Sequence, residues 1–411
     1  MKLGANITDI HDKNRCIVIE AMLEYGKISR VDLSRITELN KATISKIVKE
    51  LLEAGLAEEI GSIESSNGRK VSGVQLLMDD VGTVVVRVKK EGIQTAFCNL
   101  KGILENYKMV SYTEDTDIKV IVNQLVDEIE KQLACASGRG KRIMGISLAV
   151  LGWLYRVGES CKIHADGFMV LSETDMKEEV VKAFPQYQVL MDHDANMSAL
   201  AEWMDFCRTE KRKPHSMLNI VGGIGFGSGI IIKDELYRGF SGGAGEVGHM
   251  GINCLLQYKG MGKSGIYGGT FESYASPLSI RDYTRDNLWE YSETVLNEKS
   301  SLKDIYLAYE NEDPLAVKAI IRMVQYLAYG LAGLIFILNP EVIVLGDEII
   351  SSEKFQKQLN KYLNQYLPEE LSGSLIIRFS KLDEMGVLVG AGVAMVKDYL
   401  KTYKMVDFMT E

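Results

Sequence analysis

The spacing of apolar residues near the start of the chain predicts three short helices between residues 12 and 60. The first, 14–27, has apolar side chains on or near one face and ends at a glycine. The second begins at Ser29, and Asp32 three residues on makes this start similar to a capping box. The third follows Asn40, a strong N-cap residue, and is amphipathic as far as its closing glycine.

The polar face of the third helix carries short or basic side chains. Such residues near the start of the second helix of a pair are what a protein needs to read the DNA major groove. Lysine neutralises phosphates, and threonine and serine reach phosphates or base edges. We therefore expect DNA contacts from Lys41, Thr43, Ser45, Lys46 and Lys49.

The segment 57–76 has the pattern of a strand, a polar turn and a second strand, with the turn at Asn67-Gly68. Arg69 and Lys70 beside the turn make a basic wing that can enter a minor groove. Any three amphipathic helices show the same periodicity, so a small helical bundle used for protein contact is the alternative interpretation of this head.

From residue 80 onward, short apolar strands alternate with helices, and this succession occurs twice. It predicts an α/β body of two similar lobes, and the cleft between them is the first place to expect a ligand. Strands are expected at 83–88, 93–100, 108–113, 143–150, 187–191, 217–223, 227–237, 341–347 and 374–380, and helices at 117–136, 174–184, 194–205, 315–338 and 385–400.

Charge and cysteine content narrow the possible function classes. The chain of 411 residues has a net charge of −9, and all of it comes from the body, because residues 1–75 hold 11 basic and 11 acidic residues. A neutral head can meet DNA while an acidic body stays away from it. The six cysteines are scattered, which is typical of reduced thiols in a cytoplasmic protein and not of a disulfide framework.

We expect no membrane partner and no secretory signal. The first fifteen residues are polar throughout. The longest uncharged apolar run, 326–338, has thirteen residues, which is too short to span a bilayer and suits a buried helix.

The stretch GFSGGAGEVGHM, residues 239–250, combines five glycines with one carboxylate and one imidazole. Glycine-rich loops cradle phosphates, bring the backbone close to other polar ligands, or simply form turns. A sugar offers vicinal hydroxyls, each a donor and an acceptor, which carboxylates and imidazole can bind. The stretch by itself leaves all three interpretations open.

Several motifs resemble the ROK family (repressors, open reading frames and sugar kinases). The segment GFGSGIIIKDELYRGFSGGAGEVGH, residues 225–249, has glycines where the family signature has them. DHDANMSALAE (192–202), FESYAS (271–276), LNPEVIVLGD (338–347) and VLVGAGVAMV (387–396) are similar to further family motifs. A winged helix-turn-helix head joined to such a body is the arrangement of the family's transcriptional repressors.

The resemblance implies an α/β fold with a winged helix-turn-helix in residues 1–75, followed by a two-lobed sugar-kinase fold of the actin-like or ribonuclease H-like ATPase type. Lobe I is expected at 76–193, and the terminal segment 385–411 is expected to return to it. Lobe II, with the sugar-binding loops, is expected at 194–384.

The resemblance also implies a monosaccharide site. In the family, the Glu and His of the glycine-rich stretch bind sugar hydroxyls, and an Asp and a Glu from two other motifs lie at the sugar. These correspond here to Asp194, Glu246, His249 and Glu272. His193 stands where the family usually has Asn, so the selected sugar can differ. Asp194 alone could also be only a helix N-cap.

Family kinases hold the nucleotide phosphates with an Asp-containing, glycine-rich loop after the first strand. Here Arg87-Val88-Lys89-Lys90-Glu91 stands in its place, with Arg87 where the Asp belongs. Asp347 replaces one glycine of the pair near the adenosine, and Ile224 replaces a threonine of the second phosphate loop. We therefore expect no ATP and no catalysis. Asp194, which matches the kinases' general base, then becomes a ligand-binding residue.

The family's structural zinc is held by the His of the glycine-rich stretch and three cysteines. Lys263, Gly265 and Thr270 stand in the places of those cysteines, and Cys254 is the only thiol nearby. One His and one Cys are too few ligands, so we expect no zinc, and His249 can face the sugar.

Taken together, the sequence predicts a cytoplasmic, sugar-responsive transcriptional regulator, in first place a repressor, with xylose or glucose as its effector. A homo-oligomer, in the simplest case a dimer, would place two heads on a pseudo-palindromic operator. The alternatives are an ATP-dependent sugar kinase with an appended head, and a body that serves only for dimerisation.

Overall fold

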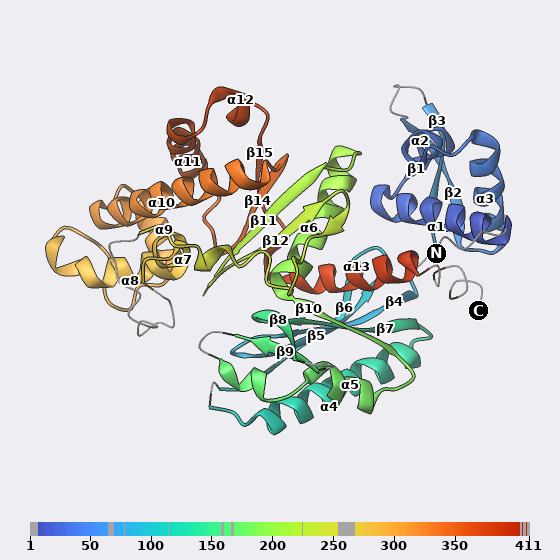
Figure 1. Cartoon of the computed structure of the whole chain (residues 1–411), viewed down its shortest axis with the longest axis horizontal. Helices are drawn as coiled ribbons and strands as arrows, with labels where there is room; N and C mark the ends of the chain where they lie inside the picture. Colours follow the sequence, from blue (N-terminus) through green and yellow to red (C-terminus); the bar gives the residue numbers. More distant parts are fainter. Residues whose placement is uncertain are drawn as a thin grey trace.

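The protein consists of a head and a body of two lobes, and the head lies at one end of the molecule (Figure 1). The computed structural model describes residues 7–64, 70–77, 79–113, 115–157, 160–165, 168–223, 225–253 and 268–402, together with 405 and 408.

The head combines three helices with a three-stranded antiparallel sheet. Its elements are α1 (Ile7–Tyr25), β1 (Ile28–Ser29), α2 (Arg30–Thr37), α3 (Lys41–Glu53), β2 (Ala57–Glu64) and β3 (Lys70–Leu76), and the strand order is β1-β3-β2. Both expected N-caps are confirmed. Ser29 Oγ accepts a hydrogen bond from Asp32 N at 3.0 Å, and Asn40 Oδ1 accepts one from Thr43 N at 2.9 Å.

Lobe I is a five-stranded mixed sheet with the order β10-β7-β4-β5-β6. Its elements are β4 (Val81–Val88), β5 (Gly92–Asn99), β6 (Leu104–Ser111), α4 (Ile118–Gly138), β7 (Arg142–Val150), β8 (Trp153–Val157), β9 (Ser160–His164), η1 (Met169–Glu173), α5 (Met176–Ala183) and β10 (Gln188–His193). Side chains alternate along β4, so Val84 and Val86 face α4 and α5 while Val85 faces the helices between the lobes.

Lobe II has a second five-stranded sheet, ordered β13-β12-β11-β14-β15. Its strands are β11 (Ser216–Gly222), β12 (Phe226–Ile232), β13 (Glu235–Leu236), β14 (Val342–Asp347) and β15 (Ile376–Phe379). Its helices are η2 (Val247–His249), α7 (Phe271–Ala275), α8 (Pro277–Asn287), η3 (Leu288–Glu290), α9 (Leu302–Glu310), α10 (Pro314–Leu338), α11 (Glu353–Tyr366) and α12 (Glu369–Ser372).

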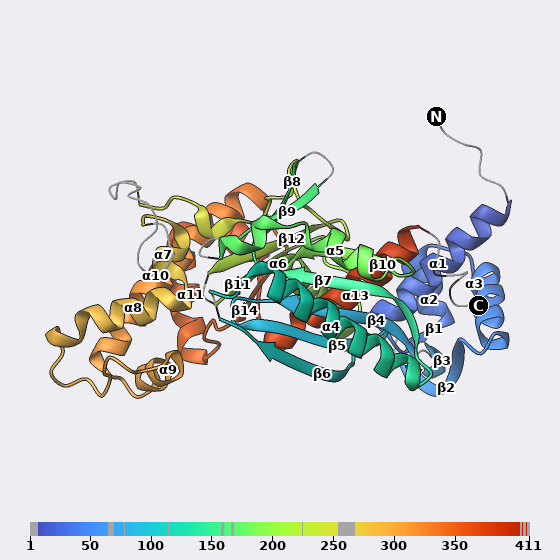
Figure 2. The same cartoon turned by 90° about the horizontal axis from the view of Figure 1, so that it is seen from below.

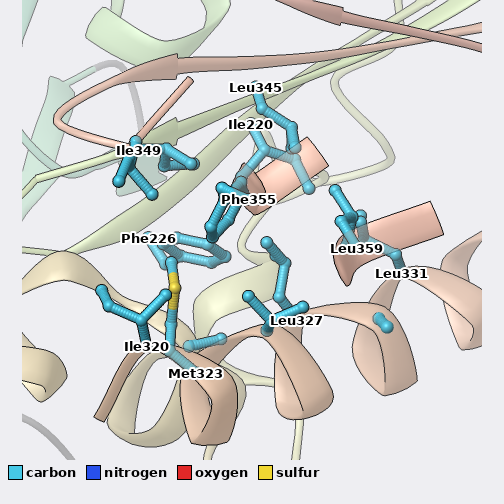
Figure 3. Packing of buried hydrophobic residues seen from close by; sticks show 14 of the residues in the cluster. Ile220, Phe226, Ile320, Met323, Leu327, Leu331, Leu345, Ile349, Phe355 and Leu359 are labelled. Atoms are coloured by element: carbon cyan, nitrogen blue, oxygen red, sulfur yellow. The ribbon is translucent and has the colours of Figure 1, made fainter. Parts of the chain in front are cut away.

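Helix α10 forms the centre of the lobe II core. Figure 3 shows Met323, Leu327 and Leu331 of this helix pointing at Ile220 and Leu345 of the sheet. The helix is long and apolar enough to cross a membrane by length and composition alone, but 56% of its most apolar window is buried inside the protein. The apolar run 326–338 is therefore the second half of a core helix, as expected.

Two helices pack between the two sheets: α6 (Asp194–Glu210) and α13 (Gly386–Lys401), which follows η4 (Asp383–Met385). They approach each other backbone to backbone, because a Cβ on Gly390 would lie only 1.6 Å from Met197 O. The terminal helix α13 also packs on β4 and β7 of lobe I. Both helices therefore lie at the junction of the two lobes.

The head is packed against the body and does not hang on a free linker. Cys16 and Ile19 of α1 belong to the same buried cluster as Met395 and Leu400 of α13. Both views show α1 beside the end of α13 (Figures 1 and 2). The apolar core thus continues across the junction between head and body.

Several elements were not predicted. The hairpin β8–β9 and helices α7, α8, α9, α11 and α12 fall in segments to which the sequence analysis gave no element. For α11 a signal was present, since Phe355, Leu359 and Leu363 recur at i, i+4 and i+8 and are buried. The β8–β9 hairpin has no comparable repeat of apolar residues, so its formation depends on contacts with neighbouring segments.

Candidate functional site

A cavity of about 510 Å³ opens between the two lobes, a size suited to a small molecule. All five residues predicted to bind sugar line it: His193, Asp194, Glu246, His249 and Glu272. They come from β10, α6, the glycine-rich loop with η2, and α7, so both lobes contribute. The structure thus brings together residues that are up to 79 positions apart in the chain.

The glycines of the loop 239–249 let it lie flat against β12. Gly245 has a φ of +99°, and a Cβ there would be 2.4 Å from Ser228 O. Ser228 donates to Gly245 O twice, from its backbone N at 3.0 Å and from Oγ at 2.8 Å. The loop therefore presents Glu246 and His249 to the cavity from a fixed backbone.

Four side chains form a polar chain along the cavity wall. Arg87 Nη2 donates to Asp194 Oδ2 at 2.8 Å. His193 Nε2 lies 3.3 Å from Asp194 Oδ1, and His193 Nδ1 lies 3.5 Å from Glu246 Oε1. A neutral imidazole can donate to only one of these carboxylates, so hydroxyls of a ligand can enter at the longer contacts.

The ion pair between Arg87 and Asp194 is buried, since both residues are less than a tenth exposed. Burial raises the pKa of the Asp194 carboxyl, but the Arg87 charge and the hydrogen bonds from Arg87 and from the backbone of Ala195 outweigh burial and hold that pKa below its usual value. Asp194 is thus kept ionised as an acceptor, and one of its oxygens is already engaged.

Glu272 is fixed from the opposite side of the cavity. Its Oε2 accepts a hydrogen bond from Phe226 N at 3.3 Å. A Cβ on Gly248 would lie 3.0 Å from the same oxygen, so the glycine leaves room for this carboxylate. Glu272 therefore contributes to the shape of the loop as well as to the cavity lining.

Two further residues of the cavity, Trp153 and His164, were missed by the sequence analysis. They face each other across the hairpin β8–β9, with ring centroids 4.2 Å apart, and Trp153 meets His249 edge to face at 5.7 Å. Aromatic walls with a few polar groups are typical of small-molecule sites. The only sequence feature that could have indicated this residue was a tryptophan directly after Gly152. Nothing in its own segment indicated that it would contact the glycine-rich loop.

The cavity lining includes a second set of charges, which we call the phosphate-end cluster: Arg87, Lys89, Lys90, Glu91, Asp347, Glu348 and Glu384. Lys89 Nζ pairs with Glu384 Oε2 at 3.1 Å. Asp347 has a φ of +61°, a conformation that favours glycine, and burial raises its pKa to about 6, with Arg87 partly opposing this.

Comparison with known proteins identifies the family. The family model described as "ROK family" matches residues 90–398, three quarters of the chain. The chain belongs to the ROK family. It is 28% identical to a xylose repressor of Caldicellulosiruptor bescii, over 96% of this chain and 98% of that protein. It is 24% identical to the dual regulator NagC of Escherichia coli, over 85% and 84% of the two chains.

Solved structures of ROK proteins share the fold. A ROK family transcriptional regulator, a homologue of the E. coli Mlc protein, superposes over 98% of this chain and 99% of its own with a TM-score of 0.74 and 23% identity. A ROK glucokinase from Streptomyces griseus, solved with glucose and AMPPNP, covers 76% of this chain and 98% of its own with a TM-score of 0.57 and 20% identity. The head is thus part of the match to the regulator.

The phosphate-end cluster offers few free donors to the nucleotide phosphates that ROK kinases bind. Arg87 and Lys89 are engaged by Asp194 and Glu384, and the seven residues hold three cations against four carboxylates. Phosphate oxygens are bound by donors that are not already engaged, such as a lysine or backbone N–H groups. Ile224, the other replaced position, lies outside the described residues.

The expectation that this protein holds no structural zinc stays a prediction. Lys263, Gly265 and Cys254 lie outside the described residues. Thr270 is fully buried at the start of α7. Within the part of the chain that the structure describes, no group of three or more His, Cys, Asp or Glu could hold a metal ion.

The head presents the expected DNA-facing side chains on α3. Lys41, Ser45, Lys46 and Lys49 are exposed, and Thr43 is half-buried. Lys46 and Lys49 reach Glu50 and Glu53 at 4.0 and 3.6 Å, which are weak surface pairs that phosphates can replace. In the wing, Lys70 is exposed, and Arg69 lies outside the described residues.

Replacing Lys46 by alanine is expected to weaken DNA binding for all sequences. If Lys46 contacts one phosphate, the slope of log affinity against log salt should fall in magnitude by about 0.9. Fluorescence anisotropy over a salt series measures the slope. Lys357→Ala is the matched control, because Lys357 forms a similar i, i+4 pair with Glu353 on α11, far from the head. An unchanged slope for Lys46→Ala would mean that α3 is placed wrongly on the DNA.

Proposed function

We propose that this chain is a sugar-responsive transcriptional repressor that binds an unphosphorylated monosaccharide between its lobes and does not phosphorylate it. One observation carries the proposal: five polar residues from both lobes converge on one cavity in a chain that also has a winged helix-turn-helix head. The names of its relatives, xylose repressor and NagC among them, support this class of function.

The charge of the cavity supports a neutral ligand. Its lining holds the three cations Arg87, Lys89 and Lys90 against seven carboxylates: Glu91, Asp194, Glu246, Glu272, Asp347, Glu348 and Glu384. A phosphorylated sugar would bring about two more negative charges into this surplus and would be repelled. D-xylose and D-glucose are therefore the first effectors to test, ahead of sugar phosphates.

The same geometry argues against a kinase. A general base must take a proton, but the Arg87 guanidinium holds one oxygen of Asp194 and lowers its pKa. The phosphoryl donor would also have to displace the pairs Arg87–Asp194 and Lys89–Glu384. An ATP-dependent sugar kinase with an appended head is the second candidate, and ADP release in a coupled assay would establish it.

The regulatory cycle follows from linkage. A homodimer in the cytoplasm would place two heads on a pseudo-palindromic operator. For the sugar to relieve repression, it must prefer the lobe arrangement in which the head binds DNA poorly. The sugar then changes the affinity for DNA by the same factor as DNA changes the affinity for the sugar.

The test is operator affinity with and without sugars. A duplex selected by the wild-type protein from a random pool is titrated with D-xylose, D-glucose, N-acetylglucosamine and glucose 6-phosphate at millimolar concentration. One neutral sugar is expected to weaken DNA binding about 5- to 150-fold, the usual range of allosteric coupling, and the phosphate is expected to have no effect. No response to any sugar, or ADP release with ATP and sugar, would refute the proposal.

A further inference from the structure

Helix α6 runs from the sugar cavity to the DNA-binding head. Its first residue, Asp194, lines the cavity, and with 17 residues it is about 25 Å long. The segment that follows its last turn lies beside the end of α1, the first helix of the head. Helix α13 also begins near the cavity, two residues after Glu384, but its end contacts α1 mainly through apolar side chains.

Three basic side chains hold the last turn of α1: Arg208 in the last turn of α6, and Lys211 and Lys213 just after the helix. Arg208 Nη2 donates to Leu23 O at 3.2 Å, and Lys211 Nζ donates to Tyr25 O at 3.3 Å. Lys213 Nζ pairs with the Glu24 carboxylate at 3.0 Å.

These contacts supply what α1 lacks. The last carbonyls of a helix have no partner within it, and cations are favourable there because of the helix dipole. Helix α1 has no basic residue in its own last turn. The body therefore provides the C-terminal cap of α1 from a distant part of the chain.

The contact is buried, so separating its two partners is costly. Glu24 is only 1% exposed, and burial raises its pKa to about 8, with Lys213 partly opposing this. Separating Lys213 from Glu24 would leave a buried carboxyl without this hydrogen bond, which is unfavourable. A shift of α6 is thus expected to move α1 rather than to break the contact.

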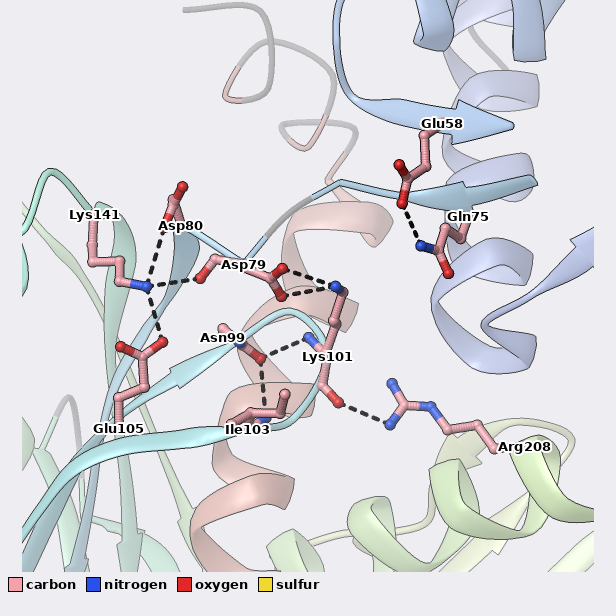
Figure 4. A network of polar contacts seen from close by, with 10 residues as sticks. All are labelled: Glu58, Gln75, Asp79, Asp80, Asn99, Lys101, Ile103, Glu105, Lys141 and Arg208. Atoms are coloured by element: carbon pink, nitrogen blue, oxygen red, sulfur yellow. Dashed lines mark hydrogen bonds and ion pairs between the residues drawn. The ribbon is translucent and has the colours of Figure 1, made fainter. Parts of the chain in front are cut away.

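Arg208 ties the same point to lobe I. Its Nη1 donates to Lys101 O, in the turn between β5 and β6, at 2.9 Å (Figure 4). One guanidinium therefore joins α6, lobe I and the head. At the other end, a Cβ on Gly229 of β12 would lie 2.4 Å from Ala199 Cβ, so α6 also follows lobe II closely.

We propose that α6 is the link that carries occupancy of the sugar cavity to the DNA-binding head, through Arg208, Lys211 and Lys213 at its C-terminal end. This inference rests on the proposed function. Because α6 is packed between α13 and the sheet of lobe II, it shifts as a rigid body when the lobes close, as packed helices do. The shift changes the position of α1 and, through its core, that of α3.

The test separates coupling from both binding events. A variant with Lys211→Met, Lys213→Met and Glu24→Gln removes two of the three contacts without leaving Glu24 as an unpaired buried charge. Sugar affinity and operator affinity, each measured alone, are expected to change by less than about threefold, since neither site is touched. The loss of operator affinity on adding D-xylose or D-glucose should fall from the wild-type value, expected at about 5- to 150-fold, to under about twofold.

Arg212→Met is the matched control. Arg212 lies between the two lysines but pairs with Glu341 of lobe II at 2.5 Å and packs over Phe206. Its replacement is expected to leave the coupling unchanged. Hydrogen exchange gives a second measurement: sugar should alter the protection of the last turn of α1 in wild type and control, but not in the triple variant.

The outcomes distinguish the two proposals. If wild-type DNA binding ignores every sugar, the proposed function fails and the link fails with it. If wild type responds and the triple variant responds equally, the proposed function stands and the link is refuted. The apolar contact between α1 and α13 would then carry the signal. Equal loss of coupling in Arg212→Met would also refute the specific role of these three contacts.

Discussion

Arg87→Met is expected to lower the free energy of unfolding by about 3–5 kcal/mol near neutral pH, because removing one partner of a buried pair leaves an uncompensated charge. Arg87 is 5% and Asp194 8% exposed, and their atoms are 2.8 Å apart. Denaturant unfolding followed by fluorescence measures the change. The double variant Arg87→Met/Asp194→Asn should recover most of the loss, since no buried charge is left.

Lys89→Met is the matched control for this prediction. Lys89 forms a similar pair with Glu384, but both side chains are partly exposed, so the expected loss is under about 1 kcal/mol. Equal losses for Lys89→Met and Arg87→Met, or a double variant as unstable as Arg87→Met, would show that the loss does not come from an uncompensated buried charge at Asp194.

The pH dependence of the contribution that Asp194 makes to stability should change sign when Arg87 is replaced by methionine. In wild type the pKa of Asp194 lies below its usual value, so its contribution to stability is present above the unfolded pKa and is lost as pH falls through the folded pKa. Without Arg87, burial dominates and raises the pKa of Asp194. Its contribution is then present below the unfolded pKa and lost as pH rises through the folded pKa.

Arg87→Met should therefore gain stability relative to wild type as the pH falls from neutral toward the unfolded pKa of the Asp194 carboxyl. His193, Asp347 and Glu384 also face this pair, and Asp347, with a pKa of about 6, titrates in the same window. The comparison is best made with Asp347→Asn in both proteins. A stability difference that does not vary with pH would contradict the assigned cause.

Glu246→Ala is expected to weaken sugar binding by about 10- to 150-fold, the value of about 1.5–3 kcal/mol for a hydrogen bond to a charged group. Glu246 lines the cavity from a fixed loop and faces His193. Operator affinity without sugar should be unchanged, so the variant would repress without responding. Calorimetric titration with D-xylose and D-glucose, together with DNA binding, measures both effects.

Glu348→Ala is the control within the same cavity. Glu348 lies in the phosphate-end cluster, where no sugar contact is expected. A larger loss of sugar affinity for Glu348→Ala than for Glu246→Ala would show that the sugar binds in a different part of the cavity from the one that we propose.

Much of the head could be predicted from local patterns. The caps at Ser29 and Asn40 and the buried stripe of α3 depend on residues three or four positions apart, and the structure has them as expected. The sugar-binding set could be predicted only through family motifs. Its convergence depends on β10, the glycine-rich loop and α7 meeting in space, which no local period encodes.

Trp153 shows why part of the site was missed. Its partners, His164 and His249, come from the next strand and from lobe II. The hairpin that carries it has no clear alternation of apolar and polar residues. A side chain whose role depends on distant neighbours carries no signal in its own segment.

The sequence by itself determined the class of the protein: a winged helix-turn-helix head and a two-lobed α/β body. Those features follow from helical and strand periodicity and from caps, which are local, whereas the carboxylates and imidazoles of the cavity were predicted through family motifs. Only the tertiary structure decided the use of Arg87, which lies 107 residues from the carboxylate that it holds, and the hold of α6 on α1, where Arg208 and Leu23 are 185 residues apart. Contacts of this range depend on how whole elements pack, and packing is a property of the assembled surfaces and not of any one segment.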